Sequence, residues 1–226
     1  MMQDAADRLA VVVLISGGGT NLQSIIDRAQ HDLPVEIRAV ISNRADAFGL
    51  ERARSAGIEA RVLDHREFSD RDSYDAALME LIDSFSPGLV VLAGFMRILT
   101  TAFARHYEGR MFNIHPSLLP KYRGLHTHER ALEAGDREHG ASVHFVTEEL
   151  DGGPLFIQAR VPVLPDDTPE TLAARVLERE HIIYPAAIRW FAEGRLRLDD
   201  HRVCLDDRPL SAPMDLAEIG CDGSPL

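Results

Sequence analysis

An asparagine and a histidine stand two positions apart near the end of a short apolar segment, residues 110–116. Side chains of a strand alternate between its two faces, so Asn113 and His115 would share one face. A polar pair at the end of a buried strand is costly unless its hydrogen bonds are satisfied. Pro116 ends the strand, and we expect the proline-bracketed loop over residues 117–122 to hold both side chains in place.

An acid in a glycine-rich turn is the predicted partner of this pair. Gly152 and Gly153 follow Asp151 directly, which predicts a tight turn that presents the carboxylate. A carboxylate beside an imidazole favours the charged imidazolium. Asn113 and His115 would donate hydrogen bonds to an oxyanion, while Asp151 orients the imidazole and helps to move protons. The combination indicates acyl or group transfer; from spacing alone, a structural histidine and an ordinary turn are alternatives.

A run of glycines joins the first expected strand to the first expected helix, with the sequence Ser-Gly-Gly-Gly-Thr-Asn over residues 16–21. Glycines let the backbone approach an anion, and a helix N-terminus offers free N–H groups. The dinucleotide-binding pattern fails because Leu22 stands where its third glycine belongs, and no Gly-Lys-Ser/Thr follows to complete a Walker A loop. The loop therefore indicates a site for a phosphate of a small substrate, with an unliganded tight turn as the alternative.

Alternating apolar and amphipathic segments predict an α/β fold. We expect strands over residues 9–16, 35–42, 59–63 and 89–92, and helices over residues 21–30, 47–56 and 71–85. This order predicts one Rossmann-like domain with a mostly parallel, doubly wound sheet, helices on both faces and right-handed crossovers. Ligands of such sheets bind beyond the carboxyl ends of the strands.

The second half continues the pattern. Strands are expected over residues 110–115, 141–147 and 155–163, with a hairpin formed by residues 196–198 and 203–205. Thr127 is expected to cap a short helix, and Thr168 with Pro169 predicts the start of a long one. Pro185 should kink or break that helix. We expect the domain to span residues 1–210 and residues 211–226 to form a flexible tail.

Composition excludes several function classes. The 226 residues include 24 Lys and Arg against 36 Asp and Glu, a formal net charge of -12, so bulk charge argues against nucleic-acid binding. Cys204 and Cys221 form no CxxC pair, and His126 and His128 lack the further ligands of a zinc set, so no metal is expected. No apolar run approaches the ~20 residues of a membrane span, and the acidic N-terminus is no signal peptide. A cytoplasmic monomer or homodimer is expected.

Several segments resemble the folate-dependent formyltransferases. Residues 112–122, Phe-Asn-Ile-His-Pro-Ser-Leu-Leu-Pro-Lys-Tyr, are similar to the family's most characteristic segment, and residues 16–23, 92–99 and 142–154 extend the likeness, which runs from about residue 9 to residue 198. The resemblance implies transfer of the formyl group of 10-formyltetrahydrofolate to the amine of glycinamide ribonucleotide in purine biosynthesis. No serine or cysteine nucleophile is evident, so we expect direct attack by the amine.

The resemblance also implies site residues. It assigns catalysis to Asn113, His115 and Asp151. Gly19, Thr20 and Asn21 would contact the phosphate of the ribonucleotide, and Glu180 its ribose hydroxyls. The pterin pocket would be lined by Met96, Arg97, Ile98 and Leu99, and Arg71 would lie near the folate tail. The segment that closes over the pterin pocket would contain Thr147, Glu148, Glu149 and Leu150.

Three other functions compete with this interpretation. A hydrolase releasing formate from the same folate could use the same three groups, but such relatives normally carry an extra N-terminal domain, whereas the first strand here is expected at residue 9. A formyltransferase acting on initiator tRNA would need a further nucleic-acid-binding domain. A ligand-binding module without catalysis is the third alternative. Ser142 is a weak pocket candidate, and His144 could either neighbour the site or lie at the edge of the core.

Overall fold

The computed structural model describes residues 8–218 and residue 220. Contacts gather the chain into two compact units, one ending at Phe112 and one beginning at Asn113. The boundary falls inside strand β5 (Met111–His115). Each unit combines strands with covering helices, which is the α/β class that the alternation of segments predicts.

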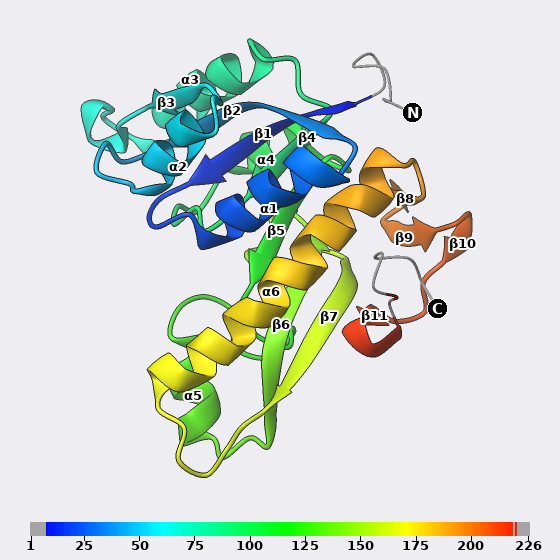
Figure 1. The fold of residues 1–226 in the computed structure, drawn as a ribbon. Coiled ribbons are helices and arrows are strands. Elements are labelled where there is room, and N and C mark those ends of the chain that lie inside the picture. Colours follow the sequence, from blue (N-terminus) through cyan, green and yellow to red (C-terminus); the bar gives the residue numbers. More distant parts are fainter. Residues whose placement is uncertain (1–7, 219, 221–226) are drawn as a thin grey trace. The chain divides into compact units, whose positions relative to one another are not determined.

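The first unit is built on parallel strands in the order β4-β1-β2-β3 (Figure 1). Their bounds are β1 (Leu9–Ile15), β2 (Val35–Ser42), β3 (Ala60–Val62) and β4 (Leu89–Leu92). Residues 11–15 of β1 are fully buried, which is typical of a parallel strand covered on both faces. The expected bounds of β2 and β4 are confirmed.

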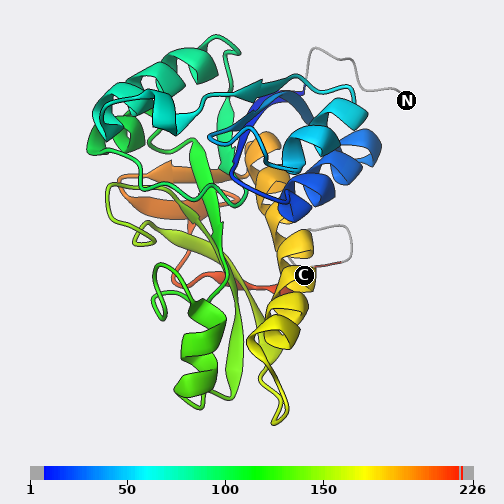
Figure 2. The same ribbon diagram turned by 90° about the vertical axis from the view of Figure 1, so that its left-hand side faces the viewer.

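Two pairs of helices cover this sheet. The helices are α1 (Thr20–His31), α2 (Gly49–Ser55), α3 (Arg71–Asp83) and α4 (Thr101–His106), with a short 3-10 helix, η2 (His65–Glu67). Helix α1 contacts α2, and α3 contacts α4. The chain runs outward through α1 and α2 on one face of the sheet and returns to β4 through α3 on the other face (Figure 2). The sequence interpretation missed α4 and η2.

The second unit has two sheets. Strands β6 (Glu138–Phe145) and β7 (Leu155–Pro162) pair antiparallel, and β11 (Met214–Asp215) pairs parallel with β7. The other sheet contains β8 (Leu196–Asp199), β9 (Arg202–Leu205) and β10 (Arg208–Pro209), all antiparallel. The expected hairpin at residues 196–205 is confirmed.

One long helix, α6 (Pro169–Ala192), packs on β6 and β7 and also contacts α5 (Thr127–Glu133) (Figure 1). The Thr168 hydroxyl accepts from Thr171 N, and the Thr171 side chain accepts from Thr168 N, so the predicted cap is confirmed as a capping box. The predicted break at Pro185 is wrong. Neighbouring side chains on one face of the helix, including Ile183 and Trp190, are fully buried, and this packing offsets the loss of one backbone hydrogen bond.

Two further expectations need correction. His126, in a left-handed conformation with φ 59°, stands at the start of α5, and the Thr127 hydroxyl donates instead to Pro116 O at 2.7 Å. Part of the expected tail is structured, since β11 and a 3-10 helix, η3 (Leu216–Glu218), lie within residues 211–218. Residue 219 and residues 221–226, with Cys221, lie outside the described residues. The domain boundary at residue 210 stays a prediction.

Among residues 8–218 and residue 220, no helix combines the length and the apolar character needed to cross a lipid bilayer.

Replacing Thr168 with alanine should destabilise the protein through loss of the α6 cap. We expect the free energy of unfolding to fall by about 1 kcal/mol and the melting temperature by roughly 2–4 °C. Thermal unfolding followed by circular dichroism measures both. Thr168→Ser is the matched control and should melt close to the wild type, because serine keeps the hydroxyl acceptor. An alanine variant as stable as the serine variant would show that the cap contributes nothing.

Candidate active site

Asn113, His115 and Asp151 come together in the second unit. His115 Nδ1 lies 3.5 Å from Asp151 Oδ2, and Asn113 Nδ2 lies 3.5 Å from Asp151 Oδ1. The His115 and Asp151 side chains are each only 7% exposed. The two residues at the end of β5 thus share a face, and the acid from the glycine-rich turn faces them both.

The turn conformation presents the Asp151 carboxylate to its donors. Asp151 has φ 50°, a left-handed conformation that aspartate tolerates better than most residues. Gly152 N donates to Glu149 O at 3.1 Å and closes the turn. Gly124 N donates to Asp151 Oδ2 at 2.9 Å, so a backbone N–H compensates part of the buried negative charge.

Both ring nitrogens of His115 face acceptors. Nε2 lies 2.9 Å from Tyr122 O, and since a carbonyl only accepts, Nε2 must carry a hydrogen. Nδ1 faces the Asp151 carboxylate. A hydrogen on Nδ1 would therefore meet an acceptor as well. The Nδ1–Asp151 distance of 3.5 Å is long for a hydrogen bond, so an Nδ1–H group is also available to a reacting oxygen without movement of the ring.

Buried side chains support the loop that carries the Tyr122 carbonyl. The Ser117 hydroxyl donates to Lys121 O at 2.6 Å, and the Ser142 hydroxyl donates to Ser117 O at 2.7 Å. Ser142 Oγ also accepts from Leu119 N at 3.1 Å and from Gln158 Nε2 at 2.8 Å. Ser142 is fully buried, so it holds the loop backbone from within rather than lining a pocket.

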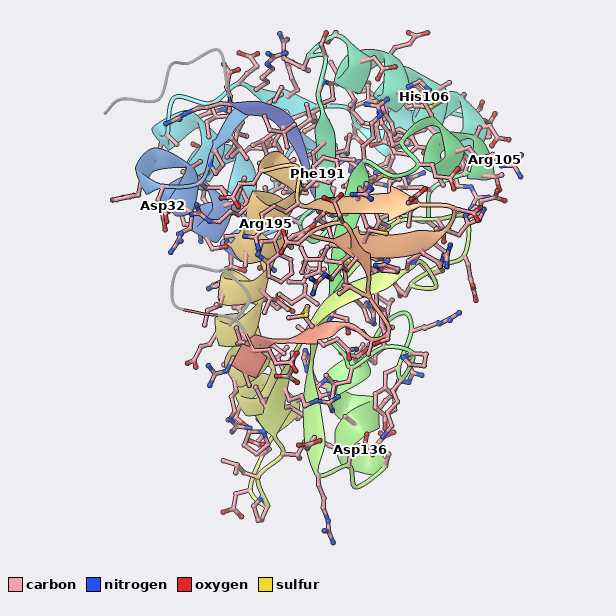
Figure 3. The ribbon with its side chains drawn as sticks, turned by 90° about the vertical axis from the view of Figure 1, so that its right-hand side faces the viewer. Asp32, Arg105, His106, Asp136, Phe191 and Arg195 are labelled. Atoms are coloured by element: carbon pink, nitrogen blue, oxygen red, sulfur yellow. The ribbon has the colours of Figure 1, made fainter. Side chains whose placement is uncertain are left out.

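Asp136 anchors the same loop from the surface (Figure 3). It accepts from Lys121 Nζ at 2.9 Å and from the Tyr122 hydroxyl at 2.8 Å. These hydrogen bonds, the one from Lys121 first, hold the pKa of Asp136 below its usual range. Beneath Tyr122, His139 Nε2 lies 3.1 Å from His128 Nδ1, and burial lowers the pKa of His139 to about 4. Asp136 therefore ties the side chains of two neighbouring loop residues, Lys121 and Tyr122, to one acceptor.

The glycine loop in the first unit turns its N–H groups away from α2. Gly17 O accepts from Gly49 N at 3.0 Å, and Gly18 O accepts from Arg52 Nε at 2.8 Å. In a trans peptide the N–H of the next residue points opposite to the carbonyl, so the N–H groups of Gly18 and Gly19 point away from α2. Gly19 has φ 69° and begins the 12-residue helix α1. These N–H groups and the helix N-terminus favour an anion.

A cavity of about 620 Å³ lies against this loop. Its lining combines the glycine loop with residues that follow the other parallel strands: Ser16, Gly17, Gly18, Gly19, Thr20, Asn21, Asn43, Arg44, His65, Ala93, Gly94, Met96 and Arg97. Three basic side chains, Arg44, His65 and Arg97, join the N-terminus of α1 in this lining. The sequence interpretation assigned no role to Asn43, Arg44 or His65. Their positions just after β2 and β3 are the signal that could have found them.

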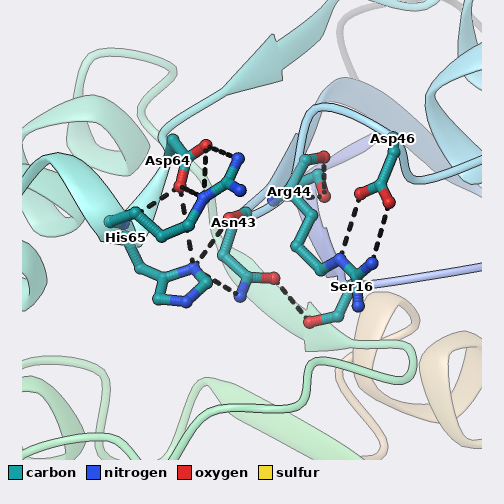
Figure 4. Close-up of polar contacts among 8 residues, drawn as sticks. Ser16, Asn43, Arg44, Asp46, Asp64 and His65 are labelled. Atoms are coloured by element: carbon teal, nitrogen blue, oxygen red, sulfur yellow. Dashed lines mark hydrogen bonds and ion pairs between the residues drawn. The ribbon is translucent and has the colours of Figure 1, made fainter.

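Hydrogen bonds tie the loops of this cavity together (Figure 4). Ser16 Oγ accepts from Met96 N at 2.8 Å and donates to Asn43 Oδ1 at 2.6 Å. His65 Nδ1 lies 3.0 Å from Asn43 O. Asp46 holds Arg44 through two contacts, of 3.0 Å to Nε and 2.8 Å to Nη2, and these contacts raise the pKa of Arg44. The loops after β1, β2 and β4 thus form one connected lining.

The other predicted ligand contacts are scattered within their units. Arg97 lies over the Tyr74 ring, 4.5 Å from its centroid, while Met96 and Ile98 are 66% and 57% exposed. The part of the chain that the structure describes lines the cavity without Arg71, Ile98 and Leu99. Arg71 is exposed at the start of α3. Thr147 and Glu148 precede the turn that carries Asp151, and Glu149 and Leu150 form part of it.

Two predicted contacts in the second unit have defined surroundings. Glu149 pairs with Arg123. Glu180 is buried within α6. Within the part of the chain that the structure describes, no group of three or more His, Cys, Asp and Glu side chains could hold a metal ion.

Comparison with known proteins matches this chain to formyltransferases. The formyl transferase family matches residues 9–188. Phosphoribosylglycinamide formyltransferase of Escherichia coli is 57% identical over 201 residues, which cover 88% of this chain and 95% of that protein. The protein of the same name from Haemophilus influenzae is 52% identical with the same coverage.

A solved structure gives the same picture for the fold. Phosphoribosylglycinamide formyltransferase from Coxiella burnetii, in complex with CHES, is 57% identical with a TM-score of 0.89 and covers 92% of this chain and 99% of that one. The predicted single α/β domain with a mostly parallel sheet flanked by helices is thereby confirmed.

Replacing Gly19 with alanine should damage the glycine loop. A Cβ there would lie 2.7 Å from Gly49 Cα, and φ 69° is unfavourable for alanine by about 1–2 kcal/mol before this collision is counted. We expect a melting temperature lower by several degrees in a thermal scan. Gly18→Ala is the matched control, because a Cβ at Gly18 would meet no atom within 4 Å. Equal melting temperatures for the two variants would contradict this account of the loop.

Proposed function

We propose a specific reaction for this chain, which belongs to the formyl transferase family. In this reaction it transfers the formyl group of 10-formyltetrahydrofolate to the amine of glycinamide ribonucleotide in purine biosynthesis. One observation carries the chemistry: an amide, an imidazole and a carboxylate meet in a site from which water is largely excluded. Donors fixed in such a site stabilise developing charge far better than donors in water.

Asn113 and His115 are the proposed oxyanion donors. The amine attacks the formyl carbon, and the carbonyl oxygen gains negative charge as the tetrahedral intermediate forms. Asn113 Nδ2–H and His115 Nδ1–H can donate to this oxygen, because the contact of each with Asp151 is long at 3.5 Å. His115 Nε2–H stays on the Tyr122 carbonyl and keeps the ring in place.

Asp151 is the proposed proton carrier and the group that orients His115. The new bond joins the amine nitrogen to the formyl carbon, and the bond between that carbon and the carrier nitrogen breaks. The amine loses one proton, and the carrier nitrogen gains one. Asp151 is placed to assist this transfer, since its carboxylate faces both His115 and Asn113.

The first unit is the proposed binding site of the ribonucleotide phosphate. Gly19, Thr20 and Asn21 at the N-terminus of α1 would donate to the phosphate oxygens, and Arg44 in the same cavity supplies positive charge.

The remaining ligand contacts follow the family resemblance. We assign the ribose hydroxyls to Glu180. The pterin is assigned to Met96, Arg97, Ile98 and Leu99, with Thr147, Glu148, Glu149 and Leu150 closing over it and Arg71 near the folate tail. The proposed reaction needs no metal, and we place it in the cytoplasm, carried out by a monomer or homodimer.

Variants of the three central residues test the chemistry. His115→Ala should lower kcat by roughly 10²–10³-fold, as for removal of an oxyanion donor. Asp151→Asn should keep substrate binding but also lower kcat sharply, because the imidazolium loses its charged partner. Steady-state assays with both substrates measure these effects. His31→Ala, which changes an exposed histidine of α1, is the control and should keep full turnover. Normal turnover in Asp151→Asn would remove Asp151 from the mechanism.

The identity of the acceptor needs its own measurement. Formate release and formyl transfer are followed with 10-formyltetrahydrofolate, with and without glycinamide ribonucleotide. We expect turnover to depend on the ribonucleotide. Formate released at the full rate in its absence would replace the transferase assignment with a hydrolase.

Replacing Arg44 with glutamine tests the phosphate cavity. We expect the KM for glycinamide ribonucleotide to rise by roughly three- to ten-fold, with the KM for the folate unchanged, since one partly exposed cation contributes a modest attraction. Arg28→Gln, in the last turn of α1, is the matched control and should leave both constants unchanged. An equal rise in the two KM values would place Arg44 outside the phosphate site.

A further inference from the structure

His144, on β6 in the second unit, is held as one neutral tautomer. Its side chain is 2% exposed. Nδ1 lies 2.8 Å from Phe145 O, so Nδ1 must carry the hydrogen. Nε2 lies 3.2 Å from Asn113 Nδ2, an amide nitrogen that only donates, so Nε2 must be bare. Burial also lowers the pKa of His144, which keeps the ring neutral near pH 7.

This tautomer decides which way the Asn113 amide points. In the observed orientation, Nδ2 faces His144 Nε2 at 3.2 Å and Asp151 Oδ1 at 3.5 Å, so its two hydrogens each meet an acceptor. A reversed amide would place Oδ1 against a bare nitrogen and against a carboxylate oxygen. Both contacts would then be repulsive in a buried site, where an unpaired polar group is most costly.

Two backbone features, a register shift in β6 and a glycine at position 153, set the position of His144 and of its acceptor. The pairing of β6 with β7 shifts its register between Val143 and His144, and such an irregularity re-aims a side chain. A Cβ at Gly153 would lie 1.9 Å from Phe145 O. The residue at 153 must therefore be glycine for the Phe145 carbonyl, the acceptor of His144 Nδ1–H, to stay where it is.

We propose that His144 is a positioning residue for formyl transfer, which fixes the Asn113 amide so that an N–H group, and not the amide oxygen, faces the reacting carbonyl. This inference rests on the proposed function. The short contact to His144 would persist through the reaction, and the 3.5 Å contact to Asp151 is the one that the formyl oxygen would replace. Asn113 would then reach the transition state without first turning its amide, which is the advantage of a donor fixed in advance.

Two substitutions of His144 separate positioning from packing. His144→Leu removes the acceptor and should lower kcat by about 10- to 100-fold, with KM values for both substrates within about two-fold of the wild type. His144→Gln can donate to Phe145 O and accept from Asn113, so it should recover most of the lost kcat. A leucine variant with wild-type kcat, or a glutamine variant no more active than a stably folded leucine variant, would overturn the proposal.

A double variant tests whether His144 acts through Asn113. If it does, adding His144→Leu to Asn113→Ala should change kcat by less than about two-fold, because the amide to be positioned is already absent. Independent effects that multiply would show instead that His144 acts by another route, and the proposal would fall.

A spectroscopic measurement decides the matter without substrates. Long-range ¹H–¹⁵N correlation of ¹⁵N-histidine-labelled wild-type protein at pH 7 reports which ring nitrogen is protonated. We expect His144 to be neutral with its hydrogen on Nδ1; the signal is assigned by its loss in His144→Gln. A hydrogen on Nε2, or a charged ring, would overturn the proposal. Because this result does not depend on catalysis, an enzyme that proves to be a hydrolase would refute the proposed acceptor and leave the tautomer assignment standing.

Discussion

The buried carboxylate of Asp151 is the constraint on which the second unit depends. An ionised group with so little exposure must be compensated by nearby donors. Gly124 N provides the shortest contact, and His115 and Asn113 provide the two longer ones. Two of these donors are therefore only loosely engaged, and they are the groups proposed above as oxyanion donors.

The groups outside the triad that directly contact the His115 and Asn113 donors are neutral. His115 is fixed by a backbone carbonyl, and Asn113 by a neutral imidazole. The loop carrying the Tyr122 carbonyl is in turn fixed by a serine hydroxyl within and an aspartate at the surface. Neutral partners orient a side chain without weakening its interaction with developing negative charge, so this arrangement suits a site that must stabilise an oxyanion.

The position of the proposed phosphate site in the first unit follows from parallel topology. Parallel strands end at one edge, so the loops that follow β1, β2 and β4 meet there and line one cavity. The Gly17 and Gly18 carbonyls accept hydrogen bonds from residues of α2, so the N–H groups that follow them point away from that helix. Gly19 and Gly49 permit this because their backbones approach within the space that a side chain would occupy. The cavity thus combines backbone N–H groups with basic side chains.

Short-range sequence patterns were enough to predict several strands, one helix cap and one part of the candidate site. Periodicity predicted the bounds of β2 and β4 and the shared face of Asn113 and His115, and the pair Thr168-Pro169 predicted the cap of α6. Each of these features depends on residues only a few positions apart. Tertiary structure alone decided that Pro185 stays within a helix, that Ser16 joins Asn43 and Met96 from 27 and 80 positions away, and that His144 presents a bare nitrogen to Asn113. A hydrogen-bond partner, and with it a tautomer, is set by which distant strands become neighbours, and no short-range pattern encodes that choice.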